Sequence, residues 1–283
     1  MYLACPFAAC GDGAILVSYE RSNMKIFKFA IIIPFFGCLF AADLPWLVAY
    51  PTLGIGVQES AHYAGSDKQR STQSHLEVGA DFLIKRDFKL HLSFASLHDG
   101  TRTYPNSYPA TPEVLEFARE GQNHDYGRET KLSVGYNLLG LMGANDHLLF
   151  LNLGYIYRSL EKNWEYRRIE WDYGLISIEL EGQKDLQGLF GTSASLLYGV
   201  RYKIPDSGEQ GYSGLDYKVK GWESELYIGG TKTINNSIDF FAKITLGKSR
   251  FDETLQYTPA VKTKSHYGIV QIGLRGNPLY YLK

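Results

Sequence analysis

Cysteine is scarce in this chain of 283 residues and is confined to its beginning. All three cysteines, Cys5, Cys10 and Cys38, lie in the first 38 residues. If the segment through Ala41 is removed, the remaining chain has no disulfide, no thiolate nucleophile and no cysteine-ligated metal site. The seven histidines are scattered without the spacing of metal ligands. We therefore expect neither a metal nor another cofactor.

Two further absences exclude large classes of protein. No window of about 18 uncharged apolar residues occurs in the body of the chain, which excludes a bundle of membrane-spanning helices. The formal net charge of −1 gives no basic excess, which argues against a nucleic-acid binder. Aromatic residues are abundant by contrast, at 14%, and there are 29 glycines, a mixture typical of an all-β protein with many short strands.

The first part of the chain carries the signs of export. Lys25 and Lys28 precede an apolar run of 12 residues, Phe29–Phe40, and Leu39-Phe40-Ala41 offers a cleavage site before Ala42. This order is typical of a secretory signal peptide, and the run is too short for a membrane-spanning helix. We therefore expect residues 24–41 to be a signal peptide and residues 1–23 to reflect a start codon assigned too far upstream. A lipoprotein acylated at Cys38 is the alternative.

Strict alternation of apolar and polar residues dominates the rest of the chain. In residues 128–138, read as RETKLSVGYNL, every second side chain is apolar or amphipathic, and those between are charged, polar or small. A period of two predicts a β-strand with one face toward an apolar medium. The pattern recurs and predicts ten strands in all. Their approximate bounds are 52–62, 74–84, 88–97, 128–138, 147–159, 169–180, 189–204, 218–231, 238–249 and 265–275.

The links between these strands alternate in length. Those after the second, fourth, sixth and eighth strands are tight, whereas the others are longer and polar. A closed antiparallel up-and-down barrel with one smooth rim and one looped rim gives this alternation. The longest link, Asp99–Tyr126, is either a binding loop or a hydrophilic cover. A change of phase at Gly174 predicts a bulge, and Pro51 predicts that no regular pairing precedes it.

Glycine and charge indicate which face lies inside. Nine strand glycines fall on the polar face, where a narrow, concave interior needs small residues and a water-washed convex surface does not. The same face carries charges of both signs that can pair inside a tube. A soluble secreted β-sandwich or barrel is the alternative. The polar residues expected to line the lumen are Glu77, Asp81, Glu129, Lys131, Arg201, Lys203, Glu223, Glu225, Lys243 and Arg275. The aromatic residues expected at the looped edge of the apolar face are Tyr155, Tyr157, Tyr198, Tyr202 and Trp222.

With these features, residues 42–283 resemble the transmembrane β-barrel proteins in the outer membrane of Gram-negative bacteria. Residues 54–57, Gly-Ile-Gly-Val, followed by Tyr-Ala-Gly-Ser-Asp at residues 63–67, resemble the first hairpin of the MipA/OmpV barrel family. The resemblance implies contact with outer-membrane lipid and lipopolysaccharide, and recognition by the outer-membrane assembly machinery. The chain departs from such barrels in ending on Leu-Tyr-Tyr-Leu-Lys instead of an aromatic residue.

Chemistry is sparse. His91-Leu92-Ser93 has the His-x-Ser spacing of similar lipid A deacylases, but both polar side chains should point inward, away from lipid esters, and no third orienting group is evident. The chain resembles the ten-stranded outer-membrane proteases, the omptins, in strand count and length. Asp99, His124 and Asp125 do not reproduce the paired Asp residues and Asp-x-His pair of that family. We therefore expect no catalytic residues.

Three functions follow from this pattern. The first is a non-catalytic barrel with a largely filled lumen and with surface loops in structural or interaction roles. The second is a narrow solute channel, because ten strands enclose a lumen between the side-chain-filled barrel of eight strands and the open barrel of sixteen. The third is a lipid A-modifying enzyme. The sequence names no ligand, solute or oligomeric state.

Overall fold

In the computed structural model, the described residues all belong to one compact unit within residues 44–283. The residues that the structure describes are 47–64, 67–85, 87–103, 125–142, 146–164, 167–186, 193–206, 210–212, 215–235, 238–255 and 261–277. The predicted signal peptide, residues 24–41, and the segment before it lie outside these residues and stay predictions. In the described part, no helix has the length and apolar character that a membrane span requires.

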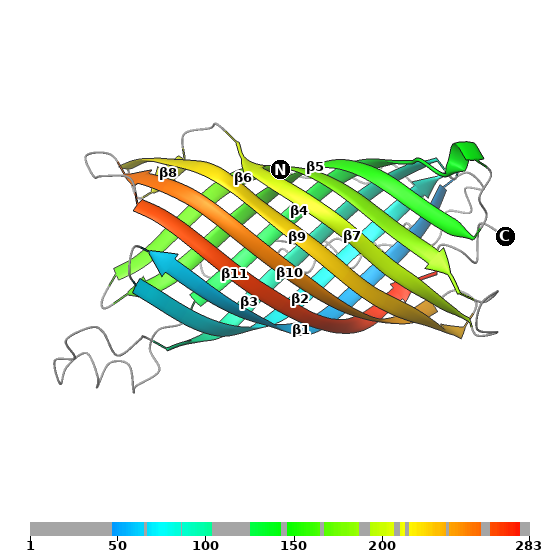
Figure 1. The fold of residues 1–283 in the computed structure, drawn as a ribbon, viewed down its shortest axis with the longest axis horizontal. Coiled ribbons are helices and arrows are strands. Elements are labelled where there is room, and N and C mark those ends of the chain that lie inside the picture. The colour runs from blue at the N-terminus through cyan, green and yellow to red at the C-terminus, as the bar shows by residue number, and fades with distance from the viewer. Residues whose placement is uncertain are drawn as a thin grey trace, which may run out of the picture. The chain divides into compact units, whose positions relative to one another are not determined.

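Nearly all described residues lie in β-strands (Figure 1). The strands are β1 (Leu47–Ala64), β2 (Asp67–Ile84), β3 (Phe88–Thr103), β4 (Asp125–Asn137), β5 (His147–Trp164), β6 (Arg167–Asp185), β7 (Ala194–Pro205), β8 (Gln210–Tyr212), β9 (Leu215–Asn235), β10 (Ile238–Leu255) and β11 (Val261–Gly276). One short 3-10 turn, η1 (Gly140–Met142), connects β4 to β5. Because β8 pairs only with the start of β9, the barrel wall consists of the other ten strands.

Each strand of the wall pairs in antiparallel fashion with its neighbours in the chain, and β1 pairs with β11 to close the ring. The closing register runs from Thr52 opposite Arg275 to Ala64 opposite Thr263. Closure means that each wall strand has a hydrogen-bonded neighbour on both sides over the part of the wall that all ten strands share. The predicted closed, ten-stranded, antiparallel up-and-down barrel is confirmed.

The strands are longer than the alternation predicted. The expected loop at residues 64–73 belongs almost entirely to β1 and β2, and the expected turn at residues 181–185 is the end of β6. The strands β1, β2, β5 and β10 each have 18 residues, against the roughly 9–11 that a tilted strand needs to cross a bilayer. The additional residues extend the wall at both rims: residues 67–73 of β2 lie toward the looped rim, whereas residues 47–51 of β1 and 181–185 of β6 lie toward the tight-turn rim.

Two local predictions were wrong. Pro51 lies within β1 opposite Ala80 of β2, but pairing with β11 begins only at Thr52, so the strand has a single neighbour where proline lacks its N–H. Gly174 lies in a regular register opposite Tyr157, without a bulge. A Cβ at Gly174 would come 1.9 Å from the hydroxyl of Tyr155, so glycine leaves space for that ring.

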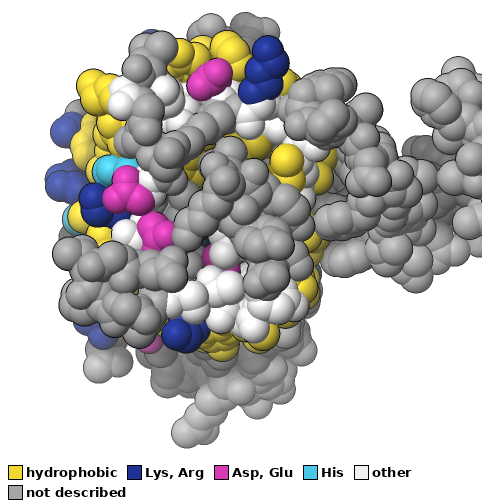
Figure 2. Space-filling view, turned by 90° about the vertical axis from the view of Figure 1, so that its right-hand side faces the viewer, with side chains coloured by type: hydrophobic (Ala, Val, Ile, Leu, Met, Phe, Trp, Pro, Cys, Tyr) yellow, Lys and Arg dark blue, Asp and Glu magenta, His cyan; other side chains and the backbone are white. Residues whose placement is uncertain are grey.

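Successive side chains alternate between the inside and the outside of the wall. In β4, the exposed fractions of Leu132 and Val134 are 51% and 58%, whereas those of Lys131 and Ser133 are 7% and 3%. Apolar side chains therefore cover the outside, and polar ones lie within. Figure 2 looks onto the right-hand end of the barrel in Figure 1, and hydrophobic side chains gather around the perimeter of this end.

Four of the five aromatic residues predicted for the looped edge lie toward that rim. They are Tyr155, Tyr157, Tyr202 and Trp222. The rings of Tyr202 and Trp222 stack with their centroids 6.3 Å apart. The fifth, Tyr198, lies toward the tight-turn rim, and its hydroxyl is 2.5 Å from Nε2 of His147 at the start of β5. The prediction failed for Tyr198 because β7 begins at Ala194, only four residues earlier.

Candidate functional site

The barrel interior is the candidate site, and at the tight-turn rim it is apolar. Tyr50 of β1, Leu83 of β2 and Leu148 and Phe150 of β5 form a buried cluster, with Val48 packed against it. The exposed fractions of these four core members are 5% or less. All point inward, so the lumen is not uniformly polar as expected. Large apolar side chains therefore pack against one another at this end of the lumen.

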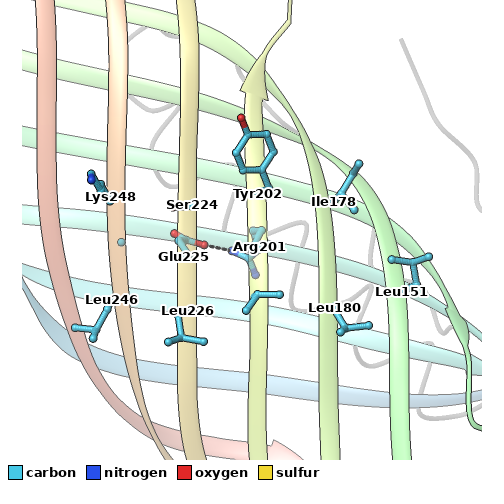
Figure 3. Close-up of a pocket in the computed structure, with 12 residues that line it drawn as sticks. Leu151, Ile178, Leu180, Arg201, Tyr202, Ser224, Glu225, Leu226, Leu246 and Lys248 are labelled. Carbon is cyan, nitrogen blue, oxygen red and sulfur yellow. Dashed lines mark hydrogen bonds and ion pairs between the residues drawn. The ribbon is translucent and has the colours of Figure 1, made fainter.

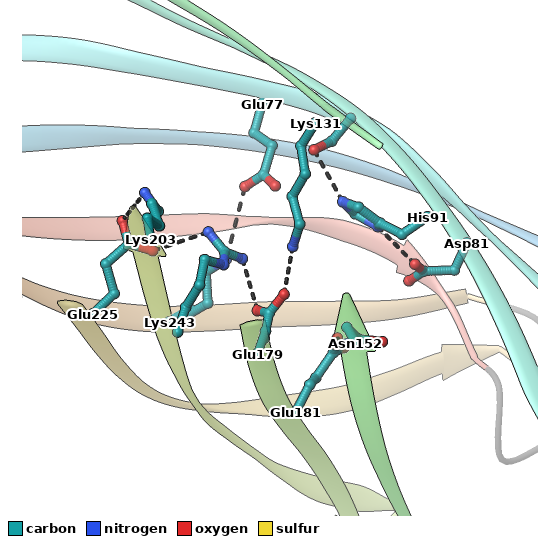
Figure 4. Close-up of polar contacts among 12 residues, drawn as sticks. Glu77, Asp81, His91, Lys131, Asn152, Glu179, Glu181, Lys203, Glu225 and Lys243 are labelled. Carbon is teal, nitrogen blue, oxygen red and sulfur yellow. Dashed lines mark hydrogen bonds and ion pairs between the residues drawn. The ribbon is translucent and has the colours of Figure 1, made fainter. Parts of the chain in front are cut away.

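Above this cluster, ion pairs connect strands that are not neighbours in the wall (Figure 4). Lys131 of β4 donates to Glu179 of β6 at 2.5 Å, although β5 separates their strands. Lys89 of β3 pairs with Glu181 of β6, across the two intervening strands β4 and β5. These two pairs must pass through the lumen. Arg201 of β7 adds bonds between adjacent strands, to Glu179 at 2.7 Å and to Glu225 of β9 at 2.9 Å.

A second group of pairs lies closer to the looped rim. Arg158 of β5 binds both carboxylate oxygens of Glu223 on β9, at 2.8 and 2.9 Å, and its Nε lies 2.5 Å from Glu129. Lys203 donates to Glu223 at 2.5 Å and to Glu225 at 2.8 Å, and only 1% of its side chain is exposed. Two-pronged arginine–carboxylate pairs of this kind fix both partners in one geometry.

The remaining predicted residues also lie in the inner wall. Glu77 accepts a hydrogen bond of 2.8 Å from Gln271 and lies 3.7 Å from Lys243. Asp81 and Arg275 border an interior cavity of about 80 Å³ together with both of these charged residues. A cavity of that size holds only a few water molecules, each of which occupies about 30 Å³ in the liquid. All ten residues expected in the lumen are therefore placed there.

Sequence reasoning missed several members of these networks. They are Lys89, Arg158, Glu179, Glu181 and Gln271. Only Gln271 lies on the same strand as a predicted lumen residue, Arg275, and alternates in phase with it; the other four lie on β3, β5 and β6, from which no lumen residue had been named. Glu181 was missed because residues 181–185 were interpreted as a turn. Glu179, which binds both Lys131 and Arg201, lay in a predicted strand whose polar face had not been assigned.

One cluster has the connectivity of a catalytic triad. Nδ1 of His91 is 2.7 Å from Asp81, and Nε2 of His91 is 2.9 Å from Oγ of Ser93. The expectation that His91 lacks an orienting group was therefore wrong, because Asp81 lies directly opposite His91 in the β2–β3 register. Ser93, His91 and Asp81 are therefore connected in the order of a nucleophile, a base and a group that orients the base.

The surroundings of this cluster differ from those of a nucleophilic enzyme. Ser93 is 8% exposed and faces the lumen. It pairs with Gly79 on one side and Lys131 on the other, so the backbone N–H groups around it belong to the sheet and not to an oxyanion hole. Lys131, the nearest cation by register, is engaged by Glu179.

Other candidates for chemistry do not assemble among the described residues. No group of three or more His, Cys, Asp or Glu residues there has the geometry to hold a metal ion. Asp99, His124 and Asp125, considered for a protease arrangement, lie outside the residues whose side chains are described. Most of the link Asp99–Tyr126 lies outside as well, so its predicted role stays open to experiment.

Comparison with known proteins supports the fold alone. No protein-family model and no curated protein sequence matches the chain. The solved structure of the outer membrane protease OmpT from Escherichia coli matches with a TM-score of 0.51 and 10% identity, covering 81% of this chain and 96% of that one. The transport unit of the autotransporter AIDA-I from E. coli matches with a TM-score of 0.38 and 11% identity, covering 92% and 100%. The outer membrane protein OprG from Pseudomonas aeruginosa matches with a TM-score of 0.32 and 12% identity, covering 81% and 94%.

These similarities leave the resemblance to the MipA/OmpV family as a prediction. At 10% identity, OmpT shares its architecture with this chain, and its activity does not transfer. Together with the closed ring of ten strands and the apolar outer wall, the comparison establishes the fold. The chain has the fold of a Gram-negative outer-membrane β-barrel protein.

Proposed function

We propose that the protein is an integral barrel of the outer membrane of a Gram-negative bacterium, that its lumen is sealed, and that its role is structural or interactive, without catalysis. The observation that carries the membrane location is the apolar outer wall. Leu153, Val134 and Leu246, on three different strands, are 56%, 58% and 59% exposed. Soluble monomers rarely expose more than a few hundred Å² of continuous apolar surface, whereas a barrel in a bilayer turns such a belt toward acyl chains.

The filled interior supports the absence of conduction. At the tight-turn rim, Tyr50, Leu83, Leu148 and Phe150 pack together across the lumen. Farther along, Lys and Arg side chains are paired with carboxylates on opposite strands, so their long side chains are held across the space that a solute would need. For solute to pass, both the apolar cluster at the tight-turn rim and the ion-paired side chains farther along the lumen would have to move.

The location and the seal have separate tests. Purified protein refolded from urea into liposomes should float with the vesicles through a density gradient and remain with them after an alkaline wash. Recovery in the soluble fraction would contradict the membrane location. In planar bilayers the same preparation should give no discrete conductance steps, and reproducible single-channel steps would establish the narrow channel in place of the sealed barrel.

A lipid-modifying or other hydrolytic enzyme is the second candidate, and the Asp81–His91–Ser93 cluster is the observation that favours it. A fluorophosphonate probe distinguishes the two functions because it forms a stable bond only with an activated serine. We expect no labelling of the folded protein. Labelling that disappears in Ser93→Ala but persists in Ser133→Ala, a buried serine of the neighbouring strand, would make the cluster an active site.

A further inference from the structure

The outer wall contains a groove that the sealed lumen does not explain. It lies across β5, β6, β7, β9 and β10, has a volume of about 620 Å³, and opens to the outside (Figure 3). Leu180, Val200, Leu226 and Leu246 line it, and Val200, Leu226 and Leu246 are 48%, 54% and 59% exposed.

One end of this groove is polar. Toward the looped rim it is bordered by the hydroxyl-bearing Tyr202 and Ser224 and by Lys248, as the upper part of Figure 3 shows. In the sheet, Lys248 lies opposite Ser224 of β9. The groove therefore offers apolar contacts along its length and hydrogen-bond donors at its end nearest the loops.

Two further cations lie near Lys248 on the same outer face. Arg250 follows it two residues later on β10, and Lys264 of β11 lies opposite Arg250, while the imidazole of His266 lies opposite Lys248. All four side chains are exposed. Among the described residues, Lys248 and Arg250 form no ion pair, and the nearest acid of this face along β10 is Asp252, which lies opposite Lys220. The local charge is therefore positive.

An apolar groove that ends at a group of cations fits one kind of ligand, an amphiphile with acyl chains and an anionic headgroup. We propose that this groove binds lipopolysaccharide through its phosphorylated lipid A, with acyl chains along Leu226 and Leu246 and a phosphate at Lys248 and Arg250. The inference rests on the proposed outer-membrane location. The looped rim of such barrels faces the cell exterior, and the leaflet on that side contains the phosphorylated glycolipid.

The chemistry of the cations suits this ligand. Long Lys and Arg side chains at the edge of a membrane extend their charged ends toward the headgroups while their stems remain on apolar surface. Arg250 presents a planar guanidinium that binds two phosphate oxygens at once, and Lys248 adds a compact charge two residues away. The stacked rings of Tyr202 and Trp222, beside the polar end of the groove, lie where aromatic side chains anchor a barrel at the interface.

Binding of purified lipid A to the full chain in detergent micelles, followed by native mass spectrometry, tests the proposal. Bisphosphorylated lipid A is compared with its dephosphorylated form, with phosphatidylglycerol and with inorganic phosphate. The double variant K248Q/R250Q should bind the bisphosphorylated lipid about 30-fold more weakly, because each such cation contributes roughly fivefold to the attraction of an anionic lipid. The charge-matched control K85Q/K232Q, with two exposed cations at the tight-turn rim, should bind as the unaltered protein does.

The groove itself is tested by Ser224→Phe, which fills its polar end without changing charge. This variant should also lose affinity for the bisphosphorylated lipid while remaining folded. Equal binding by K248Q/R250Q and the unaltered chain, or an equal loss in the K85Q/K232Q control, would overturn the proposal, as would binding of phosphatidylglycerol or free phosphate as tightly as lipid A. Failure of the unaltered chain to enter liposomes would instead refute the proposed location, so the two failures are distinguishable.

Discussion

At the scale of single residues, the interior depends on charges that have partners. Lys203 is 1% exposed and lies within 2.8 Å of both Glu223 and Glu225. Bringing such ions out of water costs several kcal/mol each, and the mutual attraction in the lumen offsets that cost only while the set is complete. Removal of one member leaves its partners charged and buried, so single substitutions here should be far more harmful than on the surface.

We expect Lys203→Met to lower the free energy of unfolding by about 3–5 kcal/mol, as is usual when one partner of a buried pair is removed. Urea titration of the refolded protein in lipid vesicles measures this. The double variant K203M/E225Q should regain part of the loss, because it removes one of the two carboxylates that lost Lys203, while Glu223 keeps its contact with Arg158 and Arg201 keeps its contact with Glu179. The exposed Lys232→Met should change stability by less than about 0.5 kcal/mol. Equal effects of K203M and K232M would contradict the buried network.

At the scale of the strand, each element presents one face to the lumen and one to the surroundings. In β5, Leu151 and Leu153 point outward, whereas Asn152 points inward and donates to Glu181 at 3.2 Å. A one-residue slip would exchange the two faces, so the register of every strand is set by this contrast.

A charge on the outward face of β5 tests that assignment. Leu153→Arg should destabilise the protein in a bilayer by about 2–4 kcal/mol, the usual cost of arginine near the midplane of a barrel wall. Thr130→Arg, on the outward face of the neighbouring strand β4 and nearer the looped rim, should cost about 0–1 kcal/mol. Vesicle-based unfolding measures both changes. An equally small cost for both would place Leu153 in contact with water.

The sequence was sufficient for the number and order of the strands because alternation is a local signal repeated in every wall strand. Strand ends were harder to predict: residues 67–73 are polar on both faces, so they resemble a loop although they belong to β2. The apolar cluster at the tight-turn rim was missed because Leu148 and Phe150 lie on the same inward face of β5 as its polar residues. Alternation shows which residues share a face, but it does not show that this face changes from polar to apolar along the strand.

The candidate site was only partly predictable for a related reason. Its ten charged residues could be assigned to the lumen from parity, whereas their partners depend on which strands face each other across the barrel. The pairing of Asp81 with His91 is different, because the short link between β2 and β3 sets it: both residues lie three positions from the ends of their strands. This contact could have been found from the hairpin alone.

At the scale of the whole molecule, stability requires the ring to close. The last strand, β11, pairs with β1 over Thr52–Ala64 and with β10 over Ile238–Glu253. Without it, two strand edges would present unpaired N–H and C=O groups to hydrocarbon, where each unsatisfied group costs several kcal/mol.

Deletion of residues 261–283 should therefore abolish folding into liposomes. The expected readout is loss of the folded band that migrates differently from the heated one in gel electrophoresis, together with loss of protease resistance. Deletion of residues 1–41, which precede every described strand, should preserve both properties. Folding of the chain that lacks β11 would show that the closed ring is not what stabilises the barrel.

The central claim is that the protein is apolar outside and charged inside, and site-directed spin labelling along β4 tests it most directly. In a chain whose three native cysteines are replaced by serine, single cysteines at positions 131, 132, 133 and 134 are labelled after refolding into liposomes. Collisions with oxygen, which concentrates in the acyl region, should be frequent at 132 and 134 and rare at 131 and 133. The opposite alternation, with Leu132 and Val134 shielded and Lys131 exposed to a water-soluble relaxer, would contradict the account.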